Sequence, residues 1–179
     1  MRRQFITVAV GALLFASTVA ATKEPMNYAP AEIYTKLRSQ ALGVTAKTLG
    51  VNDRVHGVLM ETGYPEAVVT LVAMADGAAS LYFSNGGGII GAGEHEGPKV
   101  AARSLIAFAA HNLKGFVPTA ETPLPTPGQT RFYILSDRGI FTAEASEVDL
   151  GENRHALSPL FYSAQELITE MRKVDESRE

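Results

Sequence analysis

Two apolar runs joined by Asp76-Gly77 constrain the fold more than any other part of this sequence. The first run, residues 67–75, reads AVVTLVAMA, and the second, residues 78–84, reads AASLYFS. An Asp-Gly pair between such runs is a strong signal for a β-hairpin, because both central residues of a type I′ turn need positive φ. We therefore predict two adjacent antiparallel strands. The almost continuous apolar character of the first strand indicates a central place in the sheet.

The length of the turn determines which side chains lie opposite each other. With Asp76 and Gly77 as the whole loop, Val72 pairs with Leu81 and Thr70 pairs with Phe83. The face that we expect to meet the core carries Val68, Val72, Met74, Ala79, Leu81 and Phe83. The opposite face carries Val69, Leu71, Ala73, Ser80, Tyr82 and Ser84, and it is half polar. We expect that second face to meet solvent or a partner.

Three helices and three further strands are predicted in the rest of the chain. Helical periodicity covers residues 30–42, 98–113 and 158–171, and the first stripe consists of Ile33, Tyr34, Leu37 and Ala41. Strand patterns cover residues 54–62, 131–136 and 140–145, with a tight turn at 137–139. The order is α-β-β-β-α-β-β-α, which predicts an α+β fold: a five-stranded antiparallel sheet with the helices on one face.

This order of elements resembles the secretion-chaperone-like α+β fold, and also the roadblock, longin and profilin-like folds. The resemblance covers residues 30–172 by element order, and no residue motif of those families is present, so no partner or activity follows from it. Residues 60–65 (METGYP) and 81–88 (LYFSNGGG) look like blocks found in uncharacterised bacterial families.

The beginning of the chain resembles a secretory signal peptide. Residues 1–4 form a short basic segment with Arg2 and Arg3, residues 5–19 are apolar and uncharged, and the small residues Ala20 and Ala21 follow. We expect cleavage after Ala20 or Ala21, a periplasmic or secreted location, and no membrane span after cleavage. An uncleaved membrane anchor is the alternative, because a segment of about 17 apolar residues can just span a bilayer.

The remaining residues, 22–179, are predicted to form one globular domain. The proline-rich residues 116–130 form a long connection inside it, either a strap over the surface or a mobile element, and a charged tail occupies 172–179. Loss of the two arginines of the leader leaves 14 of the 16 basic side chains against 19 acidic ones, a net charge of −5. Since nucleic-acid binding needs clustered Lys and Arg, we expect no nucleic-acid partner. The chain has no cysteine, which excludes thiol chemistry and disulfides.

The glycine-rich residues 84–97 (SNGGGIIGAGEHEG) are the most unusual segment. Backbone N–H groups without side-chain shielding suit a small anion or a close backbone contact, which predicts a ligand-binding loop. The candidate ligand-binding residues are Asn85, Gly86, Gly87, Gly88 and Gly91. Their spacing formally matches the dinucleotide-binding fingerprint, but the next helix begins too late and residues 99–118 contain no acid, so we expect no cofactor. A flexible connection from strand to helix is the simpler interpretation.

Ser84, His95 and Glu61 are the best catalytic candidates. Ser84 ends a strand 11 residues before His95, and Glu61 lies near the end of the first strand. The chain has neither GxSxG nor SxxK spacing around a serine. The neighbours of His95, Glu94 and Glu96, could act as metal ligands, but adjacent residues point in different directions, so we expect no metal site.

These observations favour a non-catalytic exported domain that binds a protein partner or a small ligand, with a homodimer as one form of such an interaction. The competing hypothesis is a small hydrolase or metal-dependent enzyme with its site at residues 84–96. An enzyme would need Ser84 or His95 inside a concave pocket, hydrogen-bonded to a second polar group.

Overall fold

The computed structural model describes residues 29–177, and the predicted leader at 1–21 lies outside them. The strands are β1 (Val55–Gly63), β2 (Val68–Met74), β3 (Ala79–Phe83), β4 (Gly88–Ile89), β5 (Val117–Thr119), β6 (Gln129–Ser136) and β7 (Gly139–Ser146). The helices are α1 (Glu32–Leu42), α2 (Ala46–Leu49), α3 (Glu96–His111), α4 (Glu147–Gly151) and α5 (Ser158–Glu176), with the 3-10 helix η1 (Ala92–Glu94).

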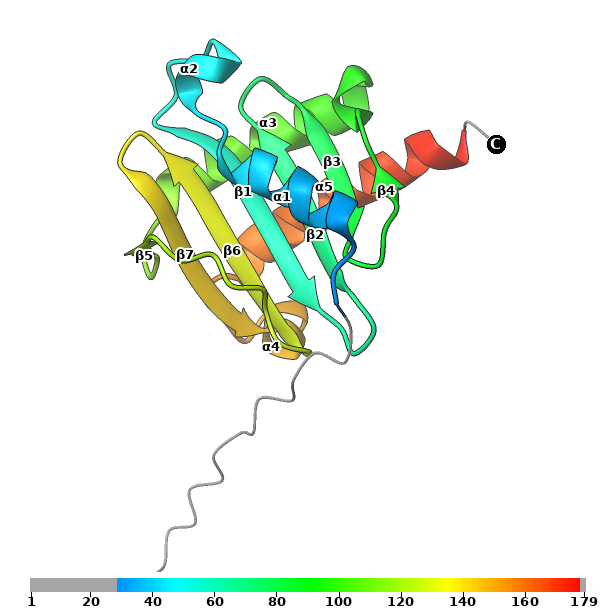
Figure 1. The fold of residues 1–179 in the computed structure, drawn as a ribbon. Helices are drawn as coiled ribbons and strands as arrows, with labels where there is room; N and C mark the ends of the chain where they lie inside the picture. The colour runs from blue at the N-terminus through cyan, green and yellow to red at the C-terminus, as the bar shows by residue number, and fades with distance from the viewer. Residues whose placement is uncertain (1–28, 178–179) are drawn as a thin grey trace, which may run out of the picture.

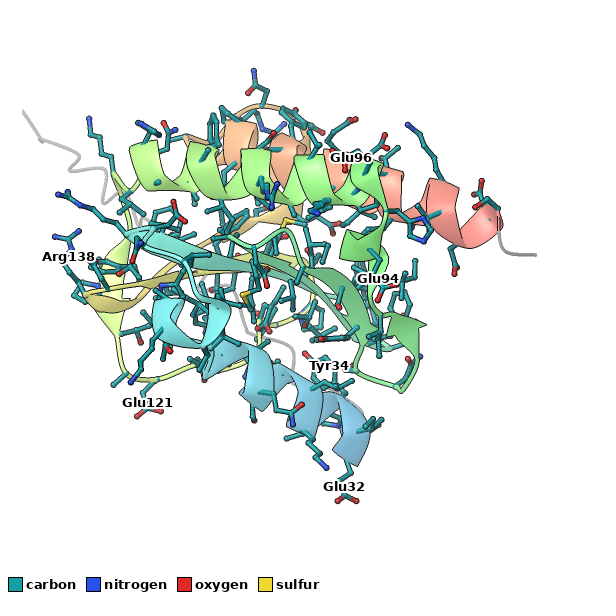
Figure 2. The ribbon with its side chains drawn as sticks, turned by 90° about the horizontal axis from the view of Figure 1, so that it is seen from above. Glu32, Tyr34, Glu94, Glu96, Glu121 and Arg138 are labelled. Carbon is teal, nitrogen blue, oxygen red and sulfur yellow. The ribbon has the colours of Figure 1, made fainter. Side chains whose placement is uncertain are left out.

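The described residues form three layers. The middle layer is an antiparallel sheet of seven strands in the order β4-β3-β2-β1-β6-β7-β5 (Figure 1). Helices α3 and α5 lie side by side on one face, and α1 lies on the other (Figure 2). No helix within residues 29–177 is both long and apolar enough to cross a bilayer.

The α+β class and the antiparallel sheet are confirmed, but the predicted number of strands and the predicted element order are wrong. The sheet has seven strands rather than five, because β4 forms inside the glycine-rich segment and β5 inside the proline-rich segment. Both extra strands lie at the edges of the sheet. A short edge strand pairs on one side only, so it tolerates glycine and proline and needs no alternating apolar pattern.

The prediction that the helices share one face is also wrong, because the sheet is buried on both sides. Val58, Leu71 and Phe132 belong to the cluster under α3 and α5. The second cluster, under α1, includes Leu59, Val72, Met74, Tyr82, Tyr133 and Leu135. All nine residues of β1 are buried, which is typical of a strand covered on both faces. Helix α1 buries Tyr34 and Ala41, whereas Ile33 of the predicted stripe is 55% exposed.

The β2–β3 turn has three residues, which changes the predicted register by one. The Gly77 N–H donates to the carbonyl of Met74, and Val72 lies opposite Ser80 instead of Leu81. Within the loop only Gly77 has a positive φ, 96°, and the Asp76 carboxylate accepts the Ala78 N–H at 2.9 Å. This is the three-residue hairpin loop with glycine in the left-handed position, not a type I′ turn. Consequently Leu71 and Ala73, rather than Val72 and Met74, share the face of Leu81.

Candidate functional site

The glycine run, the first candidate site, spans the turn between β3 and β4, strand β4 and the residue before η1. Gly86, Gly87, Gly88 and Gly91 all have positive φ, from 74° to 143°. A Cβ on Gly88 would lie 2.1 Å from the carbonyl oxygen of Leu81, so only glycine lets β4 approach β3 at this point. Asn85 is exposed in the same turn. These conformations give the run a structural reason to be rich in glycine.

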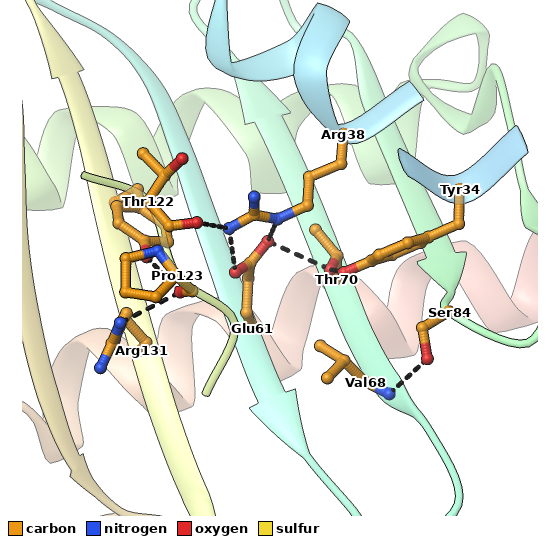
Figure 3. A network of polar contacts seen from close by, with 10 residues as sticks. Tyr34, Arg38, Glu61, Val68, Thr70, Ser84, Thr122, Pro123 and Arg131 are labelled. Atoms are coloured by element: carbon orange, nitrogen blue, oxygen red, sulfur yellow. Dashed lines mark hydrogen bonds and ion pairs between the residues drawn. The ribbon is translucent and has the colours of Figure 1, made fainter. Parts of the chain in front are cut away.

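Ser84 and His95, two of the catalytic candidates, lie apart. Ser84 is fully buried, and its Oγ accepts the backbone N–H of Val68 at 2.7 Å (Figure 3). Its carbonyl accepts the N–H of Ala31, just before α1. His95 is exposed at the start of α3, which covers the opposite face of the sheet. The structure therefore assigns Ser84 a role in joining β2, β3 and the beginning of α1.

Glu61, the third candidate, lies at the centre of a polar network beneath α1 (Figure 3). Its side chain is fully buried and forms a bidentate ion pair with Arg38, with Nε–Oε1 at 2.6 Å and Nη2–Oε2 at 2.8 Å. Thr70 Oγ1 donates to Oε1 at 3.3 Å and also contacts the Tyr34 hydroxyl at 2.8 Å. Both carboxylate oxygens thus accept hydrogen bonds from side chains of α1 and β2.

The electrostatics of Glu61 reflect two opposing effects. Burial raises the pKa of Glu61, whereas the hydrogen bonds and positive charge of Arg38 act to lower it. The fork geometry of the guanidinium matches a carboxylate and strengthens the pair. Since its oxygens are occupied by Arg38 and Thr70, we interpret Glu61 as the anchor that fixes α1 on the sheet.

The same network holds the proline-rich strap, residues 120–128, across the face that α1 covers. Arg38 Nη2 donates to the carbonyl of Thr122 at 2.8 Å. Arg131 Nη1 and the Tyr133 hydroxyl both donate to the carbonyl of Pro123, at 3.0 and 2.5 Å. Because proline has no N–H, a segment rich in proline is best held through its carbonyl oxygens. Burial raises the pKa of Tyr133, so this hydroxyl keeps its proton and remains a donor.

Gly63 at the end of β1 lets the far end of the strap approach the sheet closely. A Cβ on Gly63 would lie 2.4 Å from the carbonyl oxygen of Thr126. The carbonyl of Gly63 accepts the N–H of Gly128 at 2.8 Å. The strap is therefore attached at both its middle and its end.

A cavity of about 600 Å³ opens where the strap meets the β7 edge of the sheet. We call it the edge cavity. Its walls are β5 and the residues just before it, the first part of the strap, the middle of β7, Arg131 of β6, and the connection between α4 and α5. The lining residues are Lys114, Gly115, Val117, Thr119, Glu121, Pro123, Arg131, Thr142, Ala143, Glu144, His155, Ala156 and Leu157. Its volume lies in the range of small-ligand sites.

Polar groups of both charges line the edge cavity. Arg131 and Glu144, which lie opposite each other on β6 and β7, form an ion pair. Lys114 and Glu121 are exposed at its walls and form no ion pair with other described residues. His155 Nδ1 accepts the N–H of Leu157 at 3.2 Å, which assigns the proton of the neutral ring to Nε2 and leaves a donor there.

Sequence reasoning pointed to the other edge of the sheet. The glycine run accompanies β4, whereas the edge cavity lies beside β5 and β7, at the far end of the strand order. A usable signal was present in the second hairpin. With a two-residue loop between Ser136 and Gly139, Arg131 lies opposite Glu144. A pair of opposite charges between two otherwise apolar strands indicates a candidate functional position.

Within the described part of the chain, no group of three or more His, Asp or Glu side chains could hold a metal ion. Comparisons of the chain with protein-family models, with curated proteins and with solved structures find no significant match.

Proposed function

We propose that this protein is a non-catalytic, exported binding domain whose small ligand or protein partner occupies the edge cavity. The observation that carries the proposal is the cavity itself. It is concave, has a volume of about 600 Å³, and combines apolar walls with a few polar side chains. This combination is typical of ligand sites, in which apolar area provides affinity and a few polar groups orient the ligand. The proposed export rests on the leader-like residues 1–21.

Binding without chemistry is favoured by how the polar groups are used. Arg131 is engaged by Glu144 and by the carbonyl of Pro123, so it contributes a fixed pattern of charge. His155 is held through its Nδ1 and can donate from Nε2. Such groups orient a ligand, whereas a general base would need a basic nitrogen directed at the reacting atom.

The competing enzyme hypothesis at residues 84–96 gains no support from the position of its serine. The Ser84 hydroxyl is buried and accepts a backbone N–H, whereas His95 is exposed at the beginning of α3, the helix on the face of the sheet opposite α1. We therefore keep the binding hypothesis as our conclusion.

Filling the edge cavity provides the test. Ala156 is exposed and lines the cavity, so Ala156→Phe should occupy the ligand volume without disturbing the core. Ala78→Phe, at the exposed β2–β3 turn, is the matched control. Each protein is purified from its native envelope fraction, and bound molecules are detected by native mass spectrometry. We expect a bound species with the wild type and with Ala78→Phe, and its loss with Ala156→Phe. Equal occupancy in all three proteins would contradict the proposed site.

A further inference from the structure

Strand β5 covers only part of the outer edge of β7. It pairs with Ile140, Phe141 and Thr142, whereas β7 continues to Ser146. On its inner side, β7 pairs with β6 along its whole length. Among the described residues, the second half of β7 therefore has a strand neighbour on one side only, and Ala143 and Glu144 of this half line the edge cavity.

Proline identifies which backbone groups of β7 point outward. Alternate residues of a strand direct both their N–H and their C=O to the same side. Pro118 lies opposite Phe141 but has no N–H, so the hydrogen-bonded pairs between β5 and β7 are those of its neighbours, with Ile140 and Thr142. Glu144 is the next residue in the same series.

The backbone of Glu144 thus faces outward, beyond the position opposite Val117, where β5 begins. No other backbone group of the described residues pairs with it on that side. Its side chain meets Arg131 across the β6–β7 pair, which agrees with this alternation, because side chains lie closest at positions where the backbones do not exchange hydrogen bonds.

We propose that the edge cavity binds an extended peptide segment, which adds a strand to β7 beyond Val117, the first residue of β5. This proposal rests on the function proposed above and specifies its ligand. An unpaired strand edge is a template for another extended chain, and main-chain hydrogen bonds supply the affinity. Residues 143–146 have no second strand neighbour among the described residues, and this length corresponds to a segment of about four residues, or roughly 13 Å.

The walls of the cavity fit the side chains of such a segment. Residues of an extended chain alternate between two directions. The peptide side chains that point in one direction would face Arg131 and the polar residues Thr119 and Glu121. The side chains that point in the other direction would face Ala156 and Leu157. A peptide with alternating polar and apolar side chains therefore suits the site better than a uniformly apolar one.

The test selects peptides that bind the full-length protein from a displayed library of random octapeptides. The affinity of each enriched peptide is then measured by calorimetry. Glu144→Pro removes the outward N–H, and an edge position tolerates proline because no ladder hydrogen bond is lost. Glu144→Val keeps the N–H and removes the charge. We expect Glu144→Pro to weaken binding at least about tenfold, since a lost hydrogen bond with an unpaired acceptor costs about 1.4 kcal/mol or more. Because Glu144→Val also loses the ion pair with Arg131 but keeps the backbone N–H, it is the reference against which this tenfold decrease is measured.

A second measurement covers the case in which Glu144→Pro fails to fold. N-methylation of the peptide, one residue at a time, should abolish binding at alternate positions only, because only those N–H groups point at β7. Ala145→Pro provides the geometric control: its N–H points inward to β6, so this variant should be far less stable than Glu144→Pro.

The outcomes separate the two proposals. If no peptide is enriched, or if bound peptides tolerate every N-methyl group and the Glu144→Pro change, strand addition is wrong. A small molecule that is lost with Ala156→Phe would then still support the edge cavity as a binding site. If peptides bind and Ala156→Phe leaves their affinity unchanged, both proposals fail.

Discussion

Removal of Arg38 should destabilise the protein in a way that depends strongly on pH. Arg38→Met keeps most of the side-chain volume and removes the guanidinium. Glu61, which is 0% exposed, then retains Thr70 as its hydrogen-bond donor in the network. Breaking a buried pair by removing one partner costs about 3–5 kcal/mol, because a buried charge is left without compensation.

A limit on this cost follows from protonation. The variant can avoid a buried unpaired charge by protonating Glu61. Protonation costs about 1.36 kcal/mol for each pH unit between the ordinary glutamate pKa, near 4.3, and the pH of the experiment, which gives about 3.7 kcal/mol at pH 7. Loss of the contact between Arg38 and the Thr122 carbonyl adds to it. We expect a decrease of about 4 kcal/mol in the free energy of unfolding at pH 7.

The pH dependence follows from the sign of the pKa shift. Burial already raises the pKa of Glu61, and loss of Arg38 removes the effect that opposes this increase. The folded variant therefore binds a proton more tightly than the unfolded chain, so its stability is highest below about pH 4.3 and falls as the pH rises toward the folded-state pKa. Its deficit relative to the wild type should shrink by up to about 1.4 kcal/mol per unit between pH 7 and pH 5.

Urea denaturation followed by circular dichroism at pH 5, 6 and 7 measures this deficit. The double variant Arg38→Met/Glu61→Gln is the control, because a neutral amide replaces the carboxylate. It should recover most of the stability and lose the extra pH dependence. A deficit that is constant from pH 5 to pH 7, or a double variant as unstable as the single one, would refute the assignment of Glu61 as a buried charge held by Arg38.

Three further predictions concern the glycine run, the sheet and the surface. Gly88→Ala should cost about 3 kcal/mol or more in urea denaturation, because its Cβ would lie 2.1 Å from a backbone oxygen, whereas Gly87→Ala, with open space around the Cβ, should cost about 1 kcal/mol from its positive φ alone. Val72→Asp places an unpaired charge beneath α1, at a site that is 4% exposed, and should cost about 4 kcal/mol. A loss of this size should remove the cooperative thermal transition that a domain of this kind shows at about 50 °C. The control Ile33→Asp, at a site that is 55% exposed, should melt like the wild type. Burial and a hydrogen bond to a carboxylate raise the pKa of Tyr64 to about 12, so its contribution to stability is complete below pH 10 and is lost between pH 10 and 12; Tyr64→Phe should remove this part of the alkaline decrease in melting temperature.

Patterns with a regular period were readable from the sequence, and they gave the α+β class and the central strands. The apolar run predicted at residues 67–75 contains β2 (Val68–Met74), and the helix predicted at 98–113 corresponds to α3 (Glu96–His111). The choice of face failed for a physical reason. A strand that is apolar on both sides carries no alternation, so periodicity cannot tell which helix covers which side. The length of the turn determines the register, and an Asp-Gly pair is compatible with both a two-residue and a three-residue loop. The sequence of Asp76-Gly77 therefore does not distinguish the two registers.

The candidate site was harder to predict because it depends on contacts between distant parts of the chain. The composition of the glycine run suggested a ligand site, yet the positive φ values of Gly86, Gly87 and Gly88 serve the turn and close approach of β3 and β4. The edge cavity combines the segment before β5, the strap, β7 and the α4–α5 connection. None of these carries a motif, and only the Arg131–Glu144 pairing was accessible from hairpin register.

The buried network and the edge cavity are connected through Arg131. This residue donates to the carbonyl of Pro123 in the strap and pairs with Glu144 on β7, whose backbone forms the open strand edge. Arg38 holds the neighbouring carbonyl of Thr122 from the side of Glu61. The carboxylate that anchors α1 and the cavity wall are thus attached to consecutive residues of one strap. A change that releases Arg38 should therefore loosen the wall of the cavity, and in Arg38→Met the affinity for an enriched peptide should decrease even under conditions where the protein remains folded.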